Sequence, residues 1–159
     1  MIACDQHLAD PITTFAQRPV LVGYELCHPW YVKYRAEMDA RIRAYYSALL
    51  ATDAAELIAF RDKYGVDYLI YESALFVPGG AKGRELYYEP LEKDFQAMFE
   101  HADFVRCVLP KIADDMTVFR HAGCAVLDLS DAKLRPALAR AGYSVSGEAA
   151  TATARAAER

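Results

Sequence analysis

Two short strand patterns with a long helical pattern between them constrain the fold of this 159-residue chain more than any other feature. Residues 20–24 (VLVGY) form a nearly continuous apolar run, which is typical of a strand buried on both faces. Residues 66–71 (VDYLIY) form a second strand pattern, and each of the two leads into polar or charged residues. This strand–helix–strand order predicts an α/β domain with a mainly parallel sheet.

The segment between the two strands predicts two helices. The first has apolar side chains three or four positions apart, which places them on one face: Tyr34, Met38, Ile42, Tyr45 and Leu49. Asp53, with Glu56 three residues later, is a capping-box signal for the start of a second helix. Gly65 suits the left-handed position that ends such a helix.

Further elements complete a single α/β domain with a mixed, mostly parallel sheet of about five strands. We predict a strand at 1–4, a loop at 77–83, a helix at 90–99, strands at 104–109, 117–120 and 124–129, a hairpin turn at 121–123 and a final helix capped by Ser130. We expect the domain to span residues 1–143. Residues 144–159 contain almost no large apolar side chain, so we expect a frayed tail.

Composition and charge exclude several classes of protein. The net charge is -4 and the basic residues are scattered, whereas a nucleic-acid partner needs a concentrated basic face. The apolar runs are shorter than the roughly 20 residues of a membrane-spanning helix. Asp5, His7 and Asp10 interrupt any signal-peptide core, so composition alone predicts a soluble, unexported chain. The four cysteines are dispersed, which favours free thiols over a disulfide framework.

Polar side chains collect where the predicted strands end, and ligands of parallel sheets bind at that edge. They are Asp5 and His7 after the first strand, Glu25, Cys27 and His28 after the second, and Glu72 and Ser73 after the third. A carboxylate beside a histidine can act as a general acid or base. The exposed aromatic candidates near this edge are Trp30 and Tyr31. The alternative is that these residues only cap helices and solvate loops.

Other chemistry lacks its usual residue pattern. His7, Glu25 and His28 could bind a metal, but no HxH or HxxxH spacing places two of them on one element, so we predict no metal. Cys27 and His28 are adjacent, and adjacent side chains generally point in divergent directions; oxyanion donors cannot be identified either, which disfavours a thiolate–imidazole pair. Residues 79–83 (GGAKG) lack the GxxxxGK[ST] pattern of a phosphate loop and are better interpreted as a surface loop. We therefore predict no cofactor and no catalysis by the isolated chain.

Three segments together resemble a known family: residues 18–31 (RPVLVGYELCHPWY), 48–60 (ALLATDAAELIAF) and 63–72 (KYGVDYLIYE). From residue 2 to residue 129 the chain resembles the soluble C-terminal domain of bacterial polytopic membrane proteins of the glycosyltransferase type. In those proteins a small α/β domain follows the last membrane span and lies outside the cytoplasm.

The resemblance implies a context rather than an active site. In the family, catalysis is attributed to acidic residues in loops of the membrane body, and none of these residues can be carried over to this sequence. The chain is then expected to be a non-catalytic accessory domain at the periplasmic face of the inner membrane, with Met1 following a cut inside a longer protein. Its partners would be the membrane body and a glycan or lipid-linked sugar. The alternative is a free-standing cytoplasmic domain that binds or hydrolyses a small molecule at the strand ends.

Overall fold

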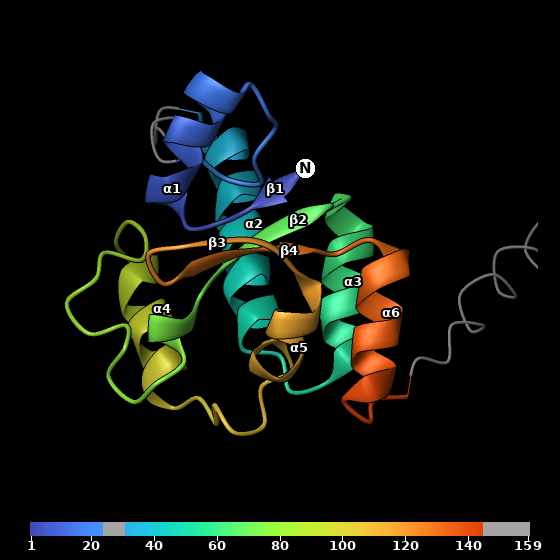
Figure 1. The fold of residues 1–159 in the computed structure, drawn as a ribbon. Helices are drawn as coiled ribbons and strands as arrows, with labels where there is room; N and C mark the ends of the chain where they lie inside the picture. The colour runs from blue at the N-terminus through green and yellow to red at the C-terminus, as the bar shows by residue number, and fades with distance from the viewer. Residues whose placement is uncertain (24–30, 145–159) are drawn as a thin grey trace, which may run out of the picture.

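The computed structural model describes residues 1–23 and 31–144, which form one α/β domain (Figure 1). In chain order the elements are β1 Ile2–Ala3, α1 Gln6–Pro11, the π-helical η1 Ile12–Ala16, α2 Val32–Leu49, α3 Ala54–Tyr64, β2 Tyr68–Glu72, the 3₁₀ turn η2 Ser73–Leu75, α4 Leu91–Glu100, α5 Leu109–Met116, β3 Thr117–His121, β4 Cys124–Asp128 and α6 Asp131–Arg140. Ser144 is the last residue described, so the predicted tail lies almost entirely outside these ranges.

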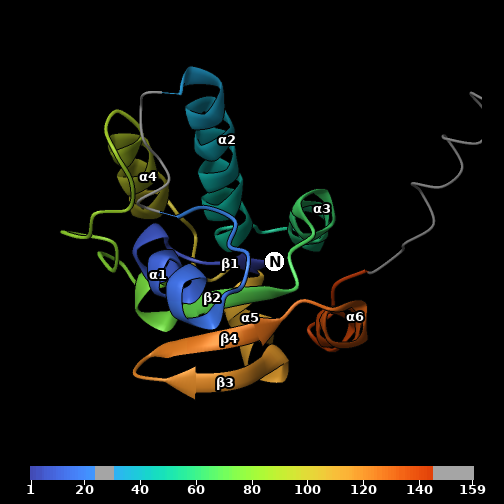
Figure 2. The same ribbon diagram turned by 90° about the horizontal axis from the view of Figure 1, so that it is seen from above.

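The sheet has four strands in the order β1-β2-β4-β3. Figure 2 shows the four strands side by side, with α2 beyond the β1 edge. Strand β1 is parallel to β2, while β4 is antiparallel to both β2 and β3. The prediction of a single α/β domain with a mixed sheet is thus confirmed. The sheet differs from the prediction in having four strands instead of about five, and only one of its three strand pairs is parallel.

A tight hairpin explains why the later strands are antiparallel. Ala122 and Gly123 both have positive φ, 46° and 84°, as the two central residues of a type I′ turn require. This turn, predicted at 121–123, returns the chain directly from β3 into β4. Strand β4 then lies beside β2 without the crossover that a parallel pair needs.

The predicted strand at 20–24 is present only in part. Val20 forms a single parallel bridge to Ile2, and the Leu21 amide donates to the Ile2 carbonyl over 2.9 Å. Leu21 and Val22 are buried. Within the described residues this segment therefore lies along the β1 edge without becoming a named strand, and Tyr24 lies outside them.

The two helices predicted between the strands are confirmed. In α2, Met38, Ile42, Tyr45 and Leu49 are buried as the apolar spacing requires, whereas Tyr34 is exposed. In α3, the Asp53 carboxylate accepts the Ala55 amide hydrogen over 2.9 Å, and Gly65 ends the helix with φ 62°.

The predicted strand at 104–109 is wrong, because a turn and a helix start occupy that segment. The Asp103 carbonyl accepts hydrogen bonds from the amides of Arg106 (3.0 Å) and Cys107 (3.2 Å), which closes a turn. Helix α5 then begins at Leu109 with Pro110 in its first turn, where proline costs no hydrogen bond. Val105 is 83% exposed, unlike a residue in a buried strand.

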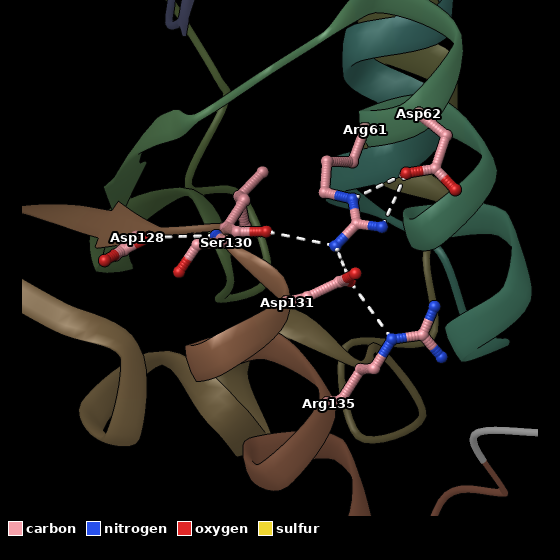
Figure 3. Close-up of polar contacts among 7 residues, drawn as sticks. Arg61, Asp62, Asp128, Ser130, Asp131 and Arg135 are labelled. Carbon is pink, nitrogen blue, oxygen red and sulfur yellow. Dashed lines mark hydrogen bonds and ion pairs between the residues drawn. The ribbon is translucent and has the colours of Figure 1, made fainter. Parts of the chain in front are cut away.

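A cluster around Arg61 holds α3 against the start of α6 (Figure 3). The Arg61 guanidinium donates to the Asp62 carboxylate from Nε (2.8 Å) and Nη2 (2.5 Å), and to the Leu129 carbonyl from Nη1 (3.3 Å). Nη1 also pairs with Asp131, whose carboxylate accepts Nε of Arg135 over 3.1 Å. The Arg61 side chain is only 11% exposed, so this cluster, called the Arg61 cluster below, fixes one edge of the fold.

Candidate functional site

The ends of β1 and β2 bring three of the predicted site residues to one cavity. Ile2 pairs with Tyr68 and Ala3 with Leu69 in a parallel register, so both strands end at the same edge of the sheet. Asp5 and His7 follow β1, and Glu72 is the last residue of β2. A cavity of about 330 Å³, called the strand-end cavity below, is lined by Asp5, His7, Leu8, Glu72, Leu75, Arg84, Glu85 and Leu86.

The other predicted site residues are not part of this cavity as described. Tyr31 precedes α2, is 71% exposed and does not line the cavity. Glu25, His28 and Trp30 lie outside the described residues, as does Cys27. Their predicted roles therefore remain predictions.

Asp5 has two contacts that use different carboxylate oxygens. Oδ1 accepts the His7 amide hydrogen over 2.9 Å and so caps α1, and Oδ2 lies 3.2 Å from the Tyr46 hydroxyl. Burial raises the pKa of the Asp5 carboxyl above its ordinary value, and the negative charge of Glu72 acts in the same direction. The amide hydrogen bond from His7 opposes this shift. Asp5 does cap a helix, as the alternative interpretation held, but the cap uses Oδ1 alone and does not explain the contact of Oδ2.

Glu72 is paired with an arginine that sequence reasoning missed. Nη1 of Arg84 donates to Oε2 of Glu72 over 2.7 Å, and this hydrogen bond holds the pKa of Arg84 above its usual range. The Glu72 side chain is 18% exposed and that of Arg84 is 39% exposed. A guanidinium has five N–H donors, and the structure gives the Arg84 side chain no second hydrogen-bond partner among the described residues. Oε1 of Glu72 likewise has no partner there, so both groups can bind a ligand.

The loop that carries Arg84 is fastened by α4. Oε2 of Glu92 accepts the amide hydrogens of Leu86 (2.8 Å) and Tyr87 (2.7 Å). The amide of Gln96 donates to the Arg84 carbonyl over 2.8 Å and to Oε1 of Glu92 over 2.9 Å. Leu86 and Tyr87 are buried, so these bonds satisfy backbone groups that water cannot reach. The wall of the cavity is therefore held in place by two side chains that do not line it.

Tyr46 is the second residue that contacts the cavity lining and that the sequence analysis did not single out. It lies four residues after Ile42 on the buried side of α2, and a buried tyrosine hydroxyl normally requires a hydrogen-bond partner. That rule could have marked Tyr46 as a residue with a polar contact inside the domain. No comparable signal in the sequence pointed to Arg84.

Two larger hollows differ in chemistry from the strand-end cavity. A groove of about 610 Å³ runs along α2 and α3 and is mainly apolar. Its lining includes Ala48, Phe60 and Met98. Another of about 540 Å³ lies under the predicted loop at 77–83, which forms consecutive turns. Neither hollow contains any of the predicted polar residues. The strand-end cavity is smaller, but the predicted site residues Asp5, His7 and Glu72 meet there.

The described cysteines are poorly suited to nucleophilic chemistry. Cys4, Cys107 and Cys124 are free, and the first two are buried. Burial raises the pKa of the Cys4 thiol to about 12, and Asp5 and Asp10 add to that shift. A thiol of that pKa is protonated at neutral pH and is a weak nucleophile.

The described residues contain neither a metal-ligand cluster nor a membrane-spanning helix. Within residues 1–23 and 31–144, no three His, Cys, Asp or Glu side chains are grouped as metal ligands. Over the same ranges, every helix is too short or too polar to cross a bilayer. In comparisons with known proteins, no protein family, no curated protein and no solved structure matches the chain.

Proposed function

We propose that this protein is a non-catalytic docking domain whose strand-end cavity binds one small, neutral, hydroxyl-rich ligand such as a single sugar unit. The observation that supports this proposal is the meeting of Asp5, His7 and Glu72 with Arg84 in one cavity. These side chains come from three separate segments of the chain. Polar residues that merely face solvent would have no reason to converge on one cavity.

The chemistry of the cavity suits a sugar. Arg84 has spare N–H donors and Glu72 a spare acceptor oxygen, and a sugar hydroxyl can accept from the first while donating to the second. Leu8, Leu75 and Leu86 supply apolar surface for the faces of the ring. The volume of about 330 Å³ is near the lower end of the range for ligand pockets, which fits one ring better than a chain.

The resemblance described above supplies the proposed setting. In that setting the chain is the extracytoplasmic, periplasmic C-terminal domain of a membrane glycosyltransferase-like protein. It would dock a glycan or lipid-linked sugar acceptor, and would contact the membrane-embedded body that performs catalysis.

Binding is tested by following backbone amide resonances while neutral hexoses, hexosamines and hexuronates are added. At about 0.3 kcal/mol for each of roughly 12 non-hydrogen atoms, we expect dissociation constants in the millimolar range. Arg84→Met should weaken binding at least tenfold, while Arg120→Met, which removes an exposed arginine elsewhere, should not. Failure of every sugar class to shift any resonance at about 50 mM, tenfold or more above the expected constants, would overturn the proposal.

The setting is tested by the genomic sequence directly upstream of Met1. We expect an in-frame extension, or a closely linked reading frame, that encodes several apolar spans of about 20 residues. A separate promoter and ribosome-binding site beside unrelated genes would contradict the membrane setting. That result would leave the sugar-binding test unaffected.

One observation favours the alternative of a free-standing hydrolytic domain. Asp5 and Glu72 are two carboxyl groups in one cavity with different surroundings, since burial raises the pKa of Asp5 while Glu72 is paired with Arg84. Such differences distinguish acids from bases in active sites. An activity screen on phosphoesters, acyl esters and activated sugars tests this. Turnover that vanished in Glu72→Gln would favour the hydrolase over the docking domain.

A further inference from the structure

The Tyr46 hydroxyl lies between two oxygen atoms that both accept hydrogen bonds. Its oxygen is 2.9 Å from the Leu86 carbonyl oxygen and 3.2 Å from Oδ2 of Asp5. Tyr46 is 1% exposed, so water does not compete for these contacts. A tyrosine hydroxyl has a single proton and can donate it to only one of the two.

Counting protons shows which form of Asp5 satisfies all of these groups. If Asp5 is ionised, one of the two oxygens faces the tyrosine oxygen with no proton between them, which is unfavourable in a buried site. If Asp5 carries a proton on Oδ2, it donates to Tyr46 and Tyr46 donates to Leu86. Oδ1 is still free to accept the His7 amide hydrogen over 2.9 Å. The Asp5 carboxyl, the Tyr46 hydroxyl, the Leu86 carbonyl and the His7 amide are then all paired.

We propose that Asp5 functions as a proton-bearing carboxylic acid, donating from Oδ2 to Tyr46, and that the cavity binds a neutral hydroxyl-bearing ligand best in this form. The choice of ligand class rests on the proposed function above, whereas the position of the proton does not.

The groups around Asp5 come from several elements. Cys4 precedes Asp5 in the sequence. The other groups are His7 on α1, Glu72 at the end of β2, Arg84 and Glu85 in the loop before α4, and Tyr45 and Tyr46 on α2. Glu92 of α4 faces Tyr46. Burial is the largest influence and favours the neutral acid, and the charge of Glu72 acts in the same direction. His7, Arg84 and a hydrogen bond donated by Tyr46 favour the ionised form of Asp5.

A neutral Asp5 determines which ligands the cavity favours. With Asp5 uncharged and Glu72 paired with Arg84, the exposed Glu85 is the one unpaired acidic side chain among the described residues that line the cavity. Neutral hexoses should then bind better than hexuronates, which meet Glu85 and Glu72, and no worse than cationic hexosamines. The proposed sugar ligand is therefore a neutral one, and ligands that bind mainly through their own charge are excluded.

Ionisation of Asp5 should weaken ligand binding. The Tyr46 proton would turn from Leu86 to Asp5, and the buried Leu86 carbonyl, which belongs to the cavity wall, would lose its donor. Because the folded protein holds the Asp5 proton more tightly than the unfolded chain does, the associated stability is complete at low pH. It is lost as pH rises through the Asp5 transition.

The position of the proton is tested in the free protein by following the ¹³C resonance of the Asp5 carboxyl during a pH titration. We expect a midpoint above the value of about 3.9 for an ordinary aspartate, because burial raises the pKa of the Asp5 carboxyl. Tyr46→Phe distinguishes the direction of the bond. If Tyr46 accepts from Asp5, removing the hydroxyl lowers the midpoint; if it donates to a carboxylate, removing it raises the midpoint. An ordinary midpoint in the wild type, or a raised one in Tyr46→Phe, overturns the inference.

The ligand half is tested by measuring neutral-hexose affinity in the wild type and in Asp5→Asn from about pH 4, near the ordinary aspartate pKa, to about pH 8. Asparagine remains a good helix cap and can donate from Nδ2 to Tyr46, so it imitates the neutral acid. We expect a three- to tenfold loss of affinity with rising pH in the wild type and no loss in Asp5→Asn. A pH-independent wild type overturns this half. Absence of hexose binding together with a high Asp5 midpoint would reject the proposed function and support the position of the proton.

Discussion

The Arg61 cluster and the strand-end cavity are both built from an arginine and acidic side chains, yet they differ in how completely the protein satisfies them. Arg61 donates from Nε, Nη1 and Nη2 to two carboxylates and a carbonyl (Figure 3). Among the described residues, the Arg84 side chain makes a single hydrogen bond, to Glu72. An arginine with all three nitrogens engaged stabilises the fold, whereas one with spare donors beside a cavity is available to a ligand.

The two regions also contain aspartates at helix starts whose pKa values shift in opposite directions. The hydrogen bond from Arg61 lowers the pKa of Asp131, at the start of α6. Burial raises the pKa of Asp5, at the start of α1. Asp5 is the N-cap of α1 and Asp131 the first residue of α6. An aspartate near a helix start therefore serves ion pairing in one region and favours its protonated form in the other. The surroundings in space decide this, and the sequence position does not.

The largest effect on stability is expected from removing the support of the cavity wall. Glu92→Ala leaves the amides of Leu86 and Tyr87 without their acceptor, which should cost about 2–3 kcal/mol of unfolding free energy. Urea denaturation measures this. Lys93→Ala, at an 82% exposed neighbour on α4, is the matched control and should change stability by less than about 0.5 kcal/mol.

Arg84→Met should separate binding from stability. Arg84 lies partly in solvent with one ion pair, so its loss should change unfolding free energy by less than about 1 kcal/mol. Sugar binding should weaken at least tenfold, because hydrogen bonds from charged donors contribute about 1.5–3 kcal/mol. An Arg84→Met variant that lost stability and kept its sugar affinity would mean that Arg84, like Arg61, stabilises the fold instead of binding the ligand.

Arg61→Met should show the opposite pattern. Methionine keeps part of the apolar stem but none of the donors, so we expect a loss of about 1–2 kcal/mol in unfolding free energy. Sugar affinity should remain within twofold of the wild type. Affinity that fell together with stability would mean that the two regions are coupled through the sheet.

The smallest effect concerns acid stability at the Arg61 cluster. Because the pKa of Asp131 is lowered in the folded state, its contribution is present above the unfolded pKa of about 3.9 and is lost as pH falls through the folded value. Asp131→Asn should therefore flatten the acid side of the stability curve below about pH 4. If the stability curves of the wild type and of Asp131→Asn stayed parallel in this acid range, the proposed contribution of Asp131 would be contradicted.

Much of the fold followed from local signals in the sequence. Asp53 and Gly65 define the ends of α3, and the turn before Gly123 defines the β3–β4 hairpin, because each of these depends on neighbours within a few residues. The direction of β4 relative to β2 and the turn at Asp103 depend on pairing and competition between elements. Periodicity carries little information about either.

The site was predictable only where strand order determined it. Asp5 and Glu72 were expected together because both follow strands, and the parallel pairing of β1 with β2 places them at one edge. Arg84 enters from a loop whose position depends on Glu92 and Gln96 of α4. Long-range contacts of this kind leave no spacing pattern in the chain.

Mapping where a bound neutral hexose perturbs the amide resonances compares the two regions most directly. We predict that the shifts concentrate at Asp5, His7, Glu72 and the Arg84–Leu86 loop, and that Arg61, Asp131 and Arg135 are unaffected. Perturbations centred on the Arg61 cluster, or spread evenly over the domain, would contradict the assignment of the strand-end cavity as the binding site.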